Sequence, residues 1–201
     1  MARRGGGRGT AARNGGVEIR EARPADLPAL ARLGAGLVRL HHAWDPLRFF
    51  LEEPLEDGYA WWLGKELRNP RAVILAAAGR GGILGYAYGR LEPRDWAVLR
   101  DRCGVGVDLF VDPAGRGRGL GRRLTEALCL RLRAMGAPRV VIQVAWPNRE
   151  ARRLFAALGF RPTMAEMVRE LPGPEAESAA APEGRKRAPR RRKVTRRRRR
   201  G

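Results

Sequence analysis

Residues 105–121 read VGVDLFVDPAGRGRGLG, an apolar run followed by a turn and a glycine-rich loop. The β-branched start predicts a strand, and Asp112-Pro113 predicts the turn that ends it. A helical pattern over 120–135 follows directly, so the loop lies at a helix N-terminus, where free N–H groups and the helix dipole favour an anion. Glycines let the main chain approach that anion closely, and arginines add charged donors. We therefore predict a pyrophosphate site that contains Arg116, Gly117, Arg118, Gly119 and Gly121.

Two other kinds of phosphate loop do not fit this stretch. The chain has no Gly-x-x-x-x-Gly-Lys-[Ser/Thr] run, which argues against a P-loop NTPase. Position 122 is arginine, so the loop does not give the Gly-x-Gly-x-x-Gly pattern of a dinucleotide-binding unit either. Such a unit is also expected near the start of a chain, before several other elements.

A second informative segment follows the first helix. Residues 139–146 form a β-branched run that predicts a strand, and Pro147 ends it. Asn148 is a good N-cap for a helix over 148–158, and Gly159 ends that helix. The apolar residues of this helix recur with the spacing of a single buried face: Ala151, Leu154, Phe155 and Leu158.

Together these segments resemble the GCN5-related N-acetyltransferases (GNAT). The pattern Arg116-x-x-Gly119-x-Gly121 resembles the family's motif A, and Asn148 to Phe160 resembles its motif B. The resemblance implies direct transfer of an acetyl group from acetyl-CoA to a primary amine. It also implies that the fourth and fifth strands diverge and that the pantetheine arm binds in the gap. Carried over residue by residue, it gives a cofactor-binding set of Leu109, Phe110, Val111, Arg116, Gly117, Arg118, Gly119, Leu120, Gly121, Asn148 and Phe155.

The chain departs from the family pattern at the usual proton donor. Many relatives have a tyrosine after the position of Leu154, where this chain has Phe155. A phenyl ring cannot donate a proton to the leaving thiolate. Because a thiolate is a good leaving group, the loss of this acid is compatible with activity. The alternative is that the chain binds acyl-CoA and catalyses acetyl transfer weakly or not at all.

Asp108 is the candidate general base, because it is a carboxylate within an apolar strand beside the expected cofactor groove. The alternative is a hydrogen-bonded aspartate at a strand edge. The stretch Asp108-Leu-Phe-Val111 resembles the diamine acetyltransferase branch, although the glutamate usual before this aspartate is Val107 here. Glu92 is a weaker alternative base. Tyr86 and Tyr88 share a face of the third strand and could reach the cleft, but sheet packing is the simpler explanation.

The periodic segments predict an α/β fold with a mixed, mostly antiparallel central sheet of six to seven strands flanked by helices. This is the acyl-CoA N-acyltransferase fold that the resemblance implies. We expect strands at 17–22, 72–78, 82–91, around 108, at 139–146 and at 167–171. Helices are expected at 24–41, 120–135 and 148–158, with a less regular helical region over 45–68. The acetyltransferase domain covers 17–173, between a disordered Gly/Arg-rich segment at 1–16 and a basic tail at 174–201.

Charge is unevenly distributed along the chain, whose net charge is +20. Between Asp45 and Glu66 there are six acidic residues and two basic ones, and this negative island would attract a small cationic amine or a basic peptide. Surface charge on an irregular helix is the alternative explanation. The tail 174–201 carries 12 basic and 3 acidic residues, and its segment 185–200 predicts non-specific contact with nucleic acid, for example at a ribosome.

The hydropathy of the chain and its two cysteines bear on its cellular location. The chain has no run of 18 apolar residues and no apolar signal region, which predicts no membrane contact. Cys103 and Cys129 lack the spacing of a metal or redox site, so we expect reduced thiols, a cytoplasmic location and no metal. The expected assembly is a monomer or a homodimer.

Overall fold

The computed structural model describes residues 16–171 of the chain. Residues 16–163 belong to one compact unit, and the short segment 164–171 belongs to another. The predicted terminal segments at 1–16 and 174–201 lie outside the described residues, apart from Gly16. The elements described below all belong to the unit 16–163.

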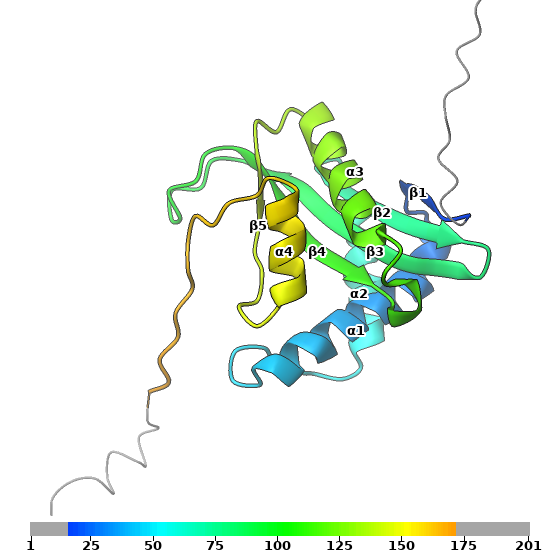
Figure 1. Ribbon diagram of the computed structural model, residues 1–201, viewed down its shortest axis with the longest axis horizontal. Coiled ribbons are helices and arrows are strands. Elements are labelled where there is room, and N and C mark those ends of the chain that lie inside the picture. Colours follow the sequence, from blue (N-terminus) through cyan, green and yellow to red (C-terminus); the bar gives the residue numbers. More distant parts are fainter. Residues whose placement is uncertain (1–15, 172–201) are drawn as a thin grey trace, which may run out of the picture. The chain divides into compact units, whose positions relative to one another are not determined.

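A five-stranded sheet forms the centre of this unit (Figure 1). Its strands lie side by side in chain order: β1 (Glu18–Glu21), β2 (Ala72–Gly79), β3 (Gly82–Glu92), β4 (Cys103–Val111) and β5 (Val140–Ile142). The first three pairings are antiparallel, and β5 runs parallel to β4. This mixed, mostly antiparallel sheet with flanking helices confirms the predicted fold class.

Helices cover both faces of the sheet. They are α1 (Leu27–Trp44), α2 (Leu55–Glu66), α3 (Leu120–Ala134) and α4 (Arg149–Ala157). Helices α1 and α2 pack on one face, and α3 packs on the other (Figure 1). In the described part of the chain, no helix is both long enough and apolar enough to cross a membrane.

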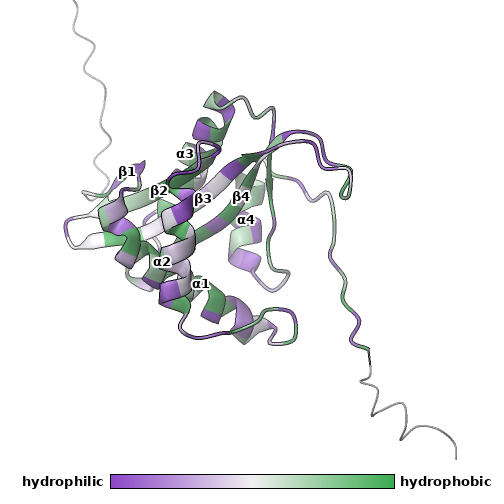
Figure 2. Ribbon diagram, turned by 180° about the vertical axis from the view of Figure 1, so that it is seen from behind, coloured by the Kyte–Doolittle hydropathy of each residue, from purple (hydrophilic) through white to green (hydrophobic). Residues whose placement is uncertain are grey.

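Helix α3 joins the sheet through a single stripe of leucines. Four residues spaced by four point inward and are buried: Leu120, Leu124, Leu128 and Leu132. They pack on one face of β2, whose alternate residues Val73, Leu75 and Ala77 belong to the same core. Hydrophobic positions are frequent along the strands and helices of this unit (Figure 2). Burial of each leucine stabilises the fold by about 1.5–3 kcal/mol. This stripe fixes the N-terminus of α3, and thus the glycine loop, against the end of β4.

The opposite face of the sheet packs against α1 and α2. Leu30 and Leu33 of α1 and Leu63 of α2 are fully buried in this second core, together with the rings of Tyr86 and Tyr88. Because successive side chains of a strand point to opposite faces of the sheet, neighbouring residues of β3 lie in different cores.

A glycine in α1 brings its partner helix close. A Cβ atom on Gly34 would lie 2.1 Å from Cδ1 of Tyr59, so only glycine lets that ring lie against α1. The ring of Tyr59 in turn packs edge-on against Trp62, one turn further along α2.

Three expectations differ from the structure. The sheet has five strands, and the predicted strand at 167–171 is absent: residues 164–171 have neither helix nor strand, because no neighbouring strand completes their backbone hydrogen bonds. Strand β5 covers only 140–142 of the predicted 139–146, since the chain beyond has no pairing with β4. The helical region expected over 45–68 contains α2 alone, which begins after Pro54.

Candidate active site

The cofactor groove predicted by the motifs corresponds to an open edge of β4. This strand pairs with β3 from Cys103 to Val111, but it pairs with β5 only at Gly104–Gly106. Among the described residues, no strand pairs with the second edge of 107–111. Backbone N–H and C=O groups on this edge can bind the amide groups of a pantetheine arm, as an added strand would. The geometry fits the divergence of the fourth and fifth strands that the resemblance implies.

The glycine loop continues from this edge and is shaped for an anion. Gly117 and Gly119 have φ angles of 71° and 70°, which favour glycine, and a Cβ on either would have no atom within 4 Å. Gly119 is the N-cap of α3 and supplies no side-chain cap, and the first turn of α3 has no acidic residue. The helix therefore presents free N–H groups and a positive dipole end to open space. This cradle fits the pyrophosphate of acetyl-CoA.

Two members of the predicted loop set have another role. Leu120 is buried in the α3 core, so only its backbone is available to a ligand. Gly121 has no positive φ, and a Cβ there would lie 3.2 Å from Cδ2 of Leu154. Gly121 thus lets α4 approach α3 closely, and its backbone N–H in the first turn of α3 is what it can offer to the predicted anion.

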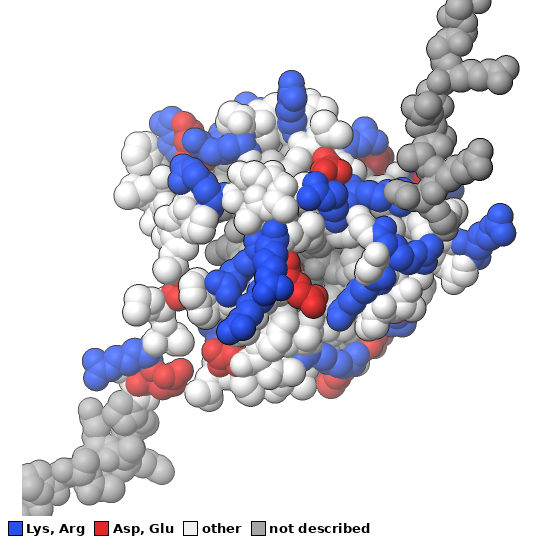
Figure 3. Space-filling view, viewed as in Figure 1, with Lys and Arg blue, Asp and Glu red and all other residues white. Residues whose placement is uncertain are grey.

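Arginines surround the loop. Arg116 is exposed, its Nε donates to the Val111 carbonyl at 3.3 Å, and its guanidinium lies 6.0 Å from the centre of the Phe110 ring. Arg118 is exposed too. Helix α4 adds Arg149, Arg152 and Arg153, and basic side chains gather over α4 in Figure 3. The surface near the loop is therefore positive, which suits a phosphorylated donor.

The side chains of β4 alternate between the two cores. Leu109 and Val111 pack with α3, whereas Phe110 packs with α1 and α2. A Cβ on Gly36 of α1 would lie 3.2 Å from the Phe110 ring. These three side chains are thus packing residues, and their backbone groups are what the open edge offers to a ligand.

The motif B residues lie on α4. Asn148 caps this helix as predicted, since its Oδ1 accepts a hydrogen bond from the Ala151 N–H at 3.0 Å, which leaves its NH₂ group as a donor for a ligand. Phe155 is buried and meets Phe160 edge-on, with 5.5 Å between ring centres. Phe155 is therefore part of the packing of α4 and supplies no proton.

Asp108 is the carboxylate at the open edge of β4. It is half-buried, and its Oδ2 accepts a hydrogen bond of 2.7 Å from the Tyr86 hydroxyl on β3. Burial raises the pKa of Asp108 to about 6, while the hydrogen bond from Tyr86 lowers it. A carboxylate with this pKa is largely ionised at neutral pH and close to the range in which it accepts and returns protons readily.

A third group, Tyr59 of α2, adjoins this pair. Burial and the nearby charge of Asp108 raise the pKa of Tyr59, and an interaction with the Tyr86 hydroxyl lowers it by a smaller amount. Tyr86 is fully buried, and its pKa is raised chiefly by burial and by Asp108. From the sequence, Tyr86 was within reach of the cleft but sheet packing was the simpler explanation, and Tyr59 was not among the candidates. Alternation along β3 could have placed Tyr86 on the same sheet face as Asp108, but nothing in the sequence aligned α2 with them.

Glu92, the weaker alternative base, lies away from Asp108. It ends β3 opposite Cys103, five residues along β4 from Asp108, or about 17 Å at ~3.3 Å per residue. Its carboxylate pairs with Arg90 on the same strand. The structure does not bring Glu92 to the glycine loop.

The predicted negative island is largely engaged in internal contacts. Arg39 of α1 pairs with both Glu53 and Glu56, at 3.0 Å each. Glu66 accepts hydrogen bonds from Tyr88 at 2.8 Å and from Asn69 at 3.0 Å. The Asp45 carboxylate accepts from the backbone of the turn after α1. Within the described residues, only Glu52 and Asp57 of the six acids carry no such contact, so the local field is weaker than the composition suggests.

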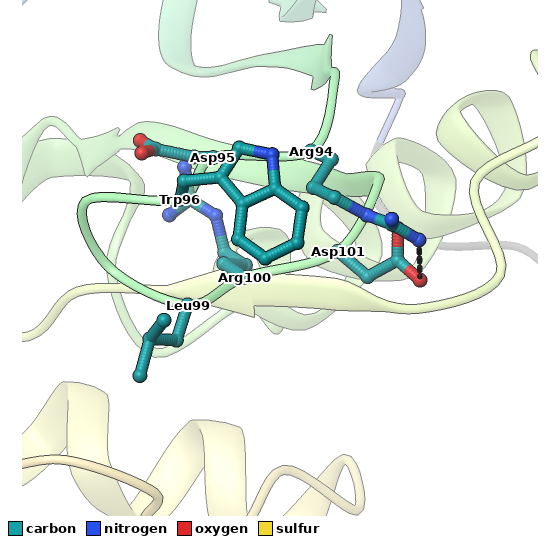
Figure 4. Close-up of a pocket in the computed structure, with 6 residues that line it drawn as sticks. All are labelled: Arg94, Asp95, Trp96, Leu99, Arg100 and Asp101. Atoms are coloured by element: carbon teal, nitrogen blue, oxygen red, sulfur yellow. Dashed lines mark hydrogen bonds and ion pairs between the residues drawn. The ribbon is translucent and has the colours of Figure 1, made fainter.

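A separate hollow lies in the β3–β4 loop (Figure 4). Its volume is about 230 Å³, and it is closed on one side by the Arg94–Asp101 ion pair. Its lining residues all belong to that loop: Arg94, Asp95, Trp96, Leu99, Arg100 and Asp101. Because this loop precedes β4 and the glycine loop follows it, the hollow is not part of the site. No group of three or more His, Cys, Asp or Glu side chains across residues 16–171 is placed to hold a metal ion.

The chain belongs to the acetyltransferase (GNAT) family. The model of that family matches residues 37–160, which include β4, the glycine loop and α4. Acetyl-CoA is the donor of this family, and the family agrees with the motifs read from the sequence.

Individual relatives differ in what their names state. A mycothiol acetyltransferase of Thermomonospora curvata is 33% identical over 63% of this chain and 42% of its own length. An L-methionine sulfoximine/L-methionine sulfone acetyltransferase of Pseudomonas paraeruginosa is 31% identical over 72% of this chain and 80% of its own. The chain thus spans less than half of that mycothiol acetyltransferase. The diamine acetyltransferase branch that Asp108-Leu-Phe-Val111 resembled is not among these names.

The fold has close counterparts among solved structures. The BH1408 protein of Bacillus halodurans superposes with a TM-score of 0.68 at 24% identity, over 77% of this chain and 99% of that one. At this level of identity the likeness concerns the fold alone.

Proposed function

We propose that this chain transfers an acetyl group from acetyl-CoA directly to a primary amine, with Asp108 as the group that accepts the amine proton. The observation that carries the proposal is the position of Asp108. Its carboxylate is half-buried at the unpaired edge of β4, it has a pKa of about 6, and the same edge leads into the glycine loop. The backbone groups proposed to bind the donor and the carboxylate proposed to accept the proton thus lie on the same strand, β4.

In this mechanism the amine must approach as the neutral base. Acetyl-CoA supplies an acetyl thioester, whose carbonyl carbon bonds to the amine nitrogen while the carbon–sulfur bond breaks. The nitrogen becomes strongly acidic once it bonds to the acetyl group, and Asp108 takes its proton. The CoA thiolate leaves and is protonated from water, because Phe155 offers no proton. The backbone of β4 and the N-terminus of α3 hold the donor in place.

For the acceptor we propose a small cationic molecule or a peptide amine. Glu52 and Asp57 support this proposal, because they remain available to attract a cation near the turn between α1 and α2. The relative named for L-methionine sulfoximine and L-methionine sulfone favours a second candidate, an amino acid.

An amine panel tests the proposal. The purified chain with acetyl-CoA is assayed for thiol release and, by mass spectrometry, for acetylated product. The panel contains spermidine, an aminoglycoside, a lysine peptide and L-methionine sulfone. Turnover of any of them, with Asp108→Asn at least ~100-fold slower, is the expected result. Binding of acetyl-CoA without turnover of any amine would instead identify an acyl-CoA-binding relative without catalysis.

A further inference from the structure

We infer that Tyr86 is a positioning residue that holds Asp108 and directs one oxygen of its carboxylate toward the reaction. This inference rests on the proposed role of Asp108. Tyr86 touches neither substrate in the mechanism above and would act only through Asp108.

The geometry of the pair supports this role. The Tyr86 hydroxyl donates to Oδ2 of Asp108 at 2.7 Å, and the tyrosine ring is fully buried in the core formed with α1 and α2. The buried ring fixes the position of the Tyr86 oxygen, which lies beside both Oδ2 of Asp108 and the Tyr59 hydroxyl, and its hydrogen is donated to the carboxylate as the stronger acceptor. Oδ2 is thereby occupied, and Oδ1 is left as the oxygen that takes a proton from a substrate.

The surroundings of Asp108 make this hydrogen bond decisive. On β3 the second tyrosine, Tyr88, donates elsewhere, to Glu66. On α2 the neighbouring group is the neutral hydroxyl of Tyr59. The cationic and histidine side chains of α1 and α2 are engaged by other partners: Arg32 by Asp112, Arg39 by Glu53 and Glu56, His41 by the Leu37 carbonyl, His42 by the Phe49 carbonyl and Lys65 by the Trp61 ring. Tyr86 is thus the group that favours the ionised carboxylate.

Tyr88 provides a matched control. It lies on the same strand and the same sheet face, it is fully buried, and its hydroxyl also donates to a carboxylate, at 2.8 Å. That carboxylate is Glu66 at the end of α2. Tyr88 lies opposite Asp108 in the sheet register, but its hydroxyl donates to Glu66, so only Tyr86→Phe removes a hydrogen bond to Asp108.

The experiment measures kcat/KM against pH with an amine that the wild-type chain acetylates. Below the pKa of Asp108 both this carboxyl and the amine must lose a proton, so log(kcat/KM) rises with a slope of 2. Above that pKa the slope is 1. Removal of a hydrogen bond to a charged group raises the pKa of the carboxyl, so Tyr86→Phe is expected to move this break upward by about one pH unit. Tyr88→Phe is expected to leave the break in place.

Three results would overturn the inference. A break that stays in place in Tyr86→Phe, or moves equally in Tyr88→Phe, assigns Tyr86 a merely structural role while the role of Asp108 stands. If Asp108→Asn retains the full rate, Asp108 is not the base, and the inference about Tyr86 is contradicted as well. Should Tyr86→Phe fail to fold, 3,5-difluorotyrosine at position 86 keeps the hydroxyl as a stronger donor, and the break must then move to lower pH.

Discussion

Asp108 is half-buried beside the hydroxyls of Tyr86 and Tyr59, and burial raises its pKa to about 6 from an ordinary value of 3.8. The folded protein therefore holds the ionised carboxylate less favourably than the unfolded chain does. Because the folded-state pKa lies above the unfolded one, the stability associated with the neutral form is present below pH ~4 and is lost as pH rises through about 6. The proposed base thus destabilises the fold at the pH at which it works.

Asp108→Asn removes this charge and keeps an oxygen that can accept the Tyr86 hydrogen bond. We expect the variant to unfold at a higher temperature than the wild type at pH 8, with a gain of about 1–3 kcal/mol in the free energy of unfolding. Thermal unfolding followed by circular dichroism at several pH values checks this. A gain as large at pH 4 as at pH 8 would contradict the assigned pKa.

The glycine loop is the element that binds the donor in this account. In Gly119→Ala the new Cβ enters the open space that we propose for the pyrophosphate, and the positive φ adds about 1 kcal/mol of strain. We expect KM for acetyl-CoA to rise about tenfold with kcat little changed, since ground-state and transition-state binding weaken together.

Gly159→Ala is the control for that strain. Gly159 ends α4 with a φ of 85° and has nothing within 4 Å of its Cβ position, so it shares the conformation of Gly119 but not its place in the loop. An equal rise of KM in both variants would show that strain, and not a lost pyrophosphate contact, weakens binding.

The contact between α1 and α2 sets the position of Tyr59 and gives a prediction about packing. Gly34→Ala forces its Cβ to within 2.1 Å of the Tyr59 ring, so we expect a loss of about 1–3 kcal/mol in the free energy of unfolding. Gly58→Ala, on α2 with open space at its Cβ, is expected to gain up to about 1 kcal/mol from helix propensity. Urea unfolding of both variants measures the two effects, and a stable Gly34→Ala variant would contradict the close packing of Tyr59.

At the scale of the molecule, local patterns predicted much of the fold. The leucines of α3 and the capping asparagine of α4 are signals within one element, and both helices formed as expected. The strand at 167–171 was wrong because a strand depends on a partner that its own residues do not specify. The open edge of β4 followed from the family resemblance, since sequence periodicity says nothing about where a neighbouring strand ends.

The site was predicted less completely, because its contacts join distant residues. Asp108 was proposed from its own strand, but its neighbour Tyr59 comes from a helix and lies 49 positions earlier in the chain. The acidic segment looked like a substrate field because Arg39, which pairs with Glu53 and Glu56, lies outside it. Charge counts along the sequence do not include such partners.

The basic tail gives a prediction for the whole chain, although it lies outside the described residues. We propose that the 12 basic residues of 174–201 bind nucleic acid through its phosphates, without any role in acetyl transfer. Deletion of 174–201 is expected to abolish retention of RNA at about 0.1 M salt and to leave KM for acetyl-CoA unchanged. A filter-binding titration against salt measures the first effect, and unchanged retention would contradict the proposal.

The most direct test of the central claim compares kcat/KM of the wild type and Asp108→Asn between pH 5 and pH 9, with acetyl-CoA binding followed by thermal shift. We expect a break near pH 6 in the wild type, where the slope of log(kcat/KM) against pH falls from 2 to 1. In Asp108→Asn it predicts a single slope of 1, with rates at least ~100-fold lower and the acetyl-CoA shift retained. Equal rates and the same break in both proteins would contradict the assignment of Asp108 as the base.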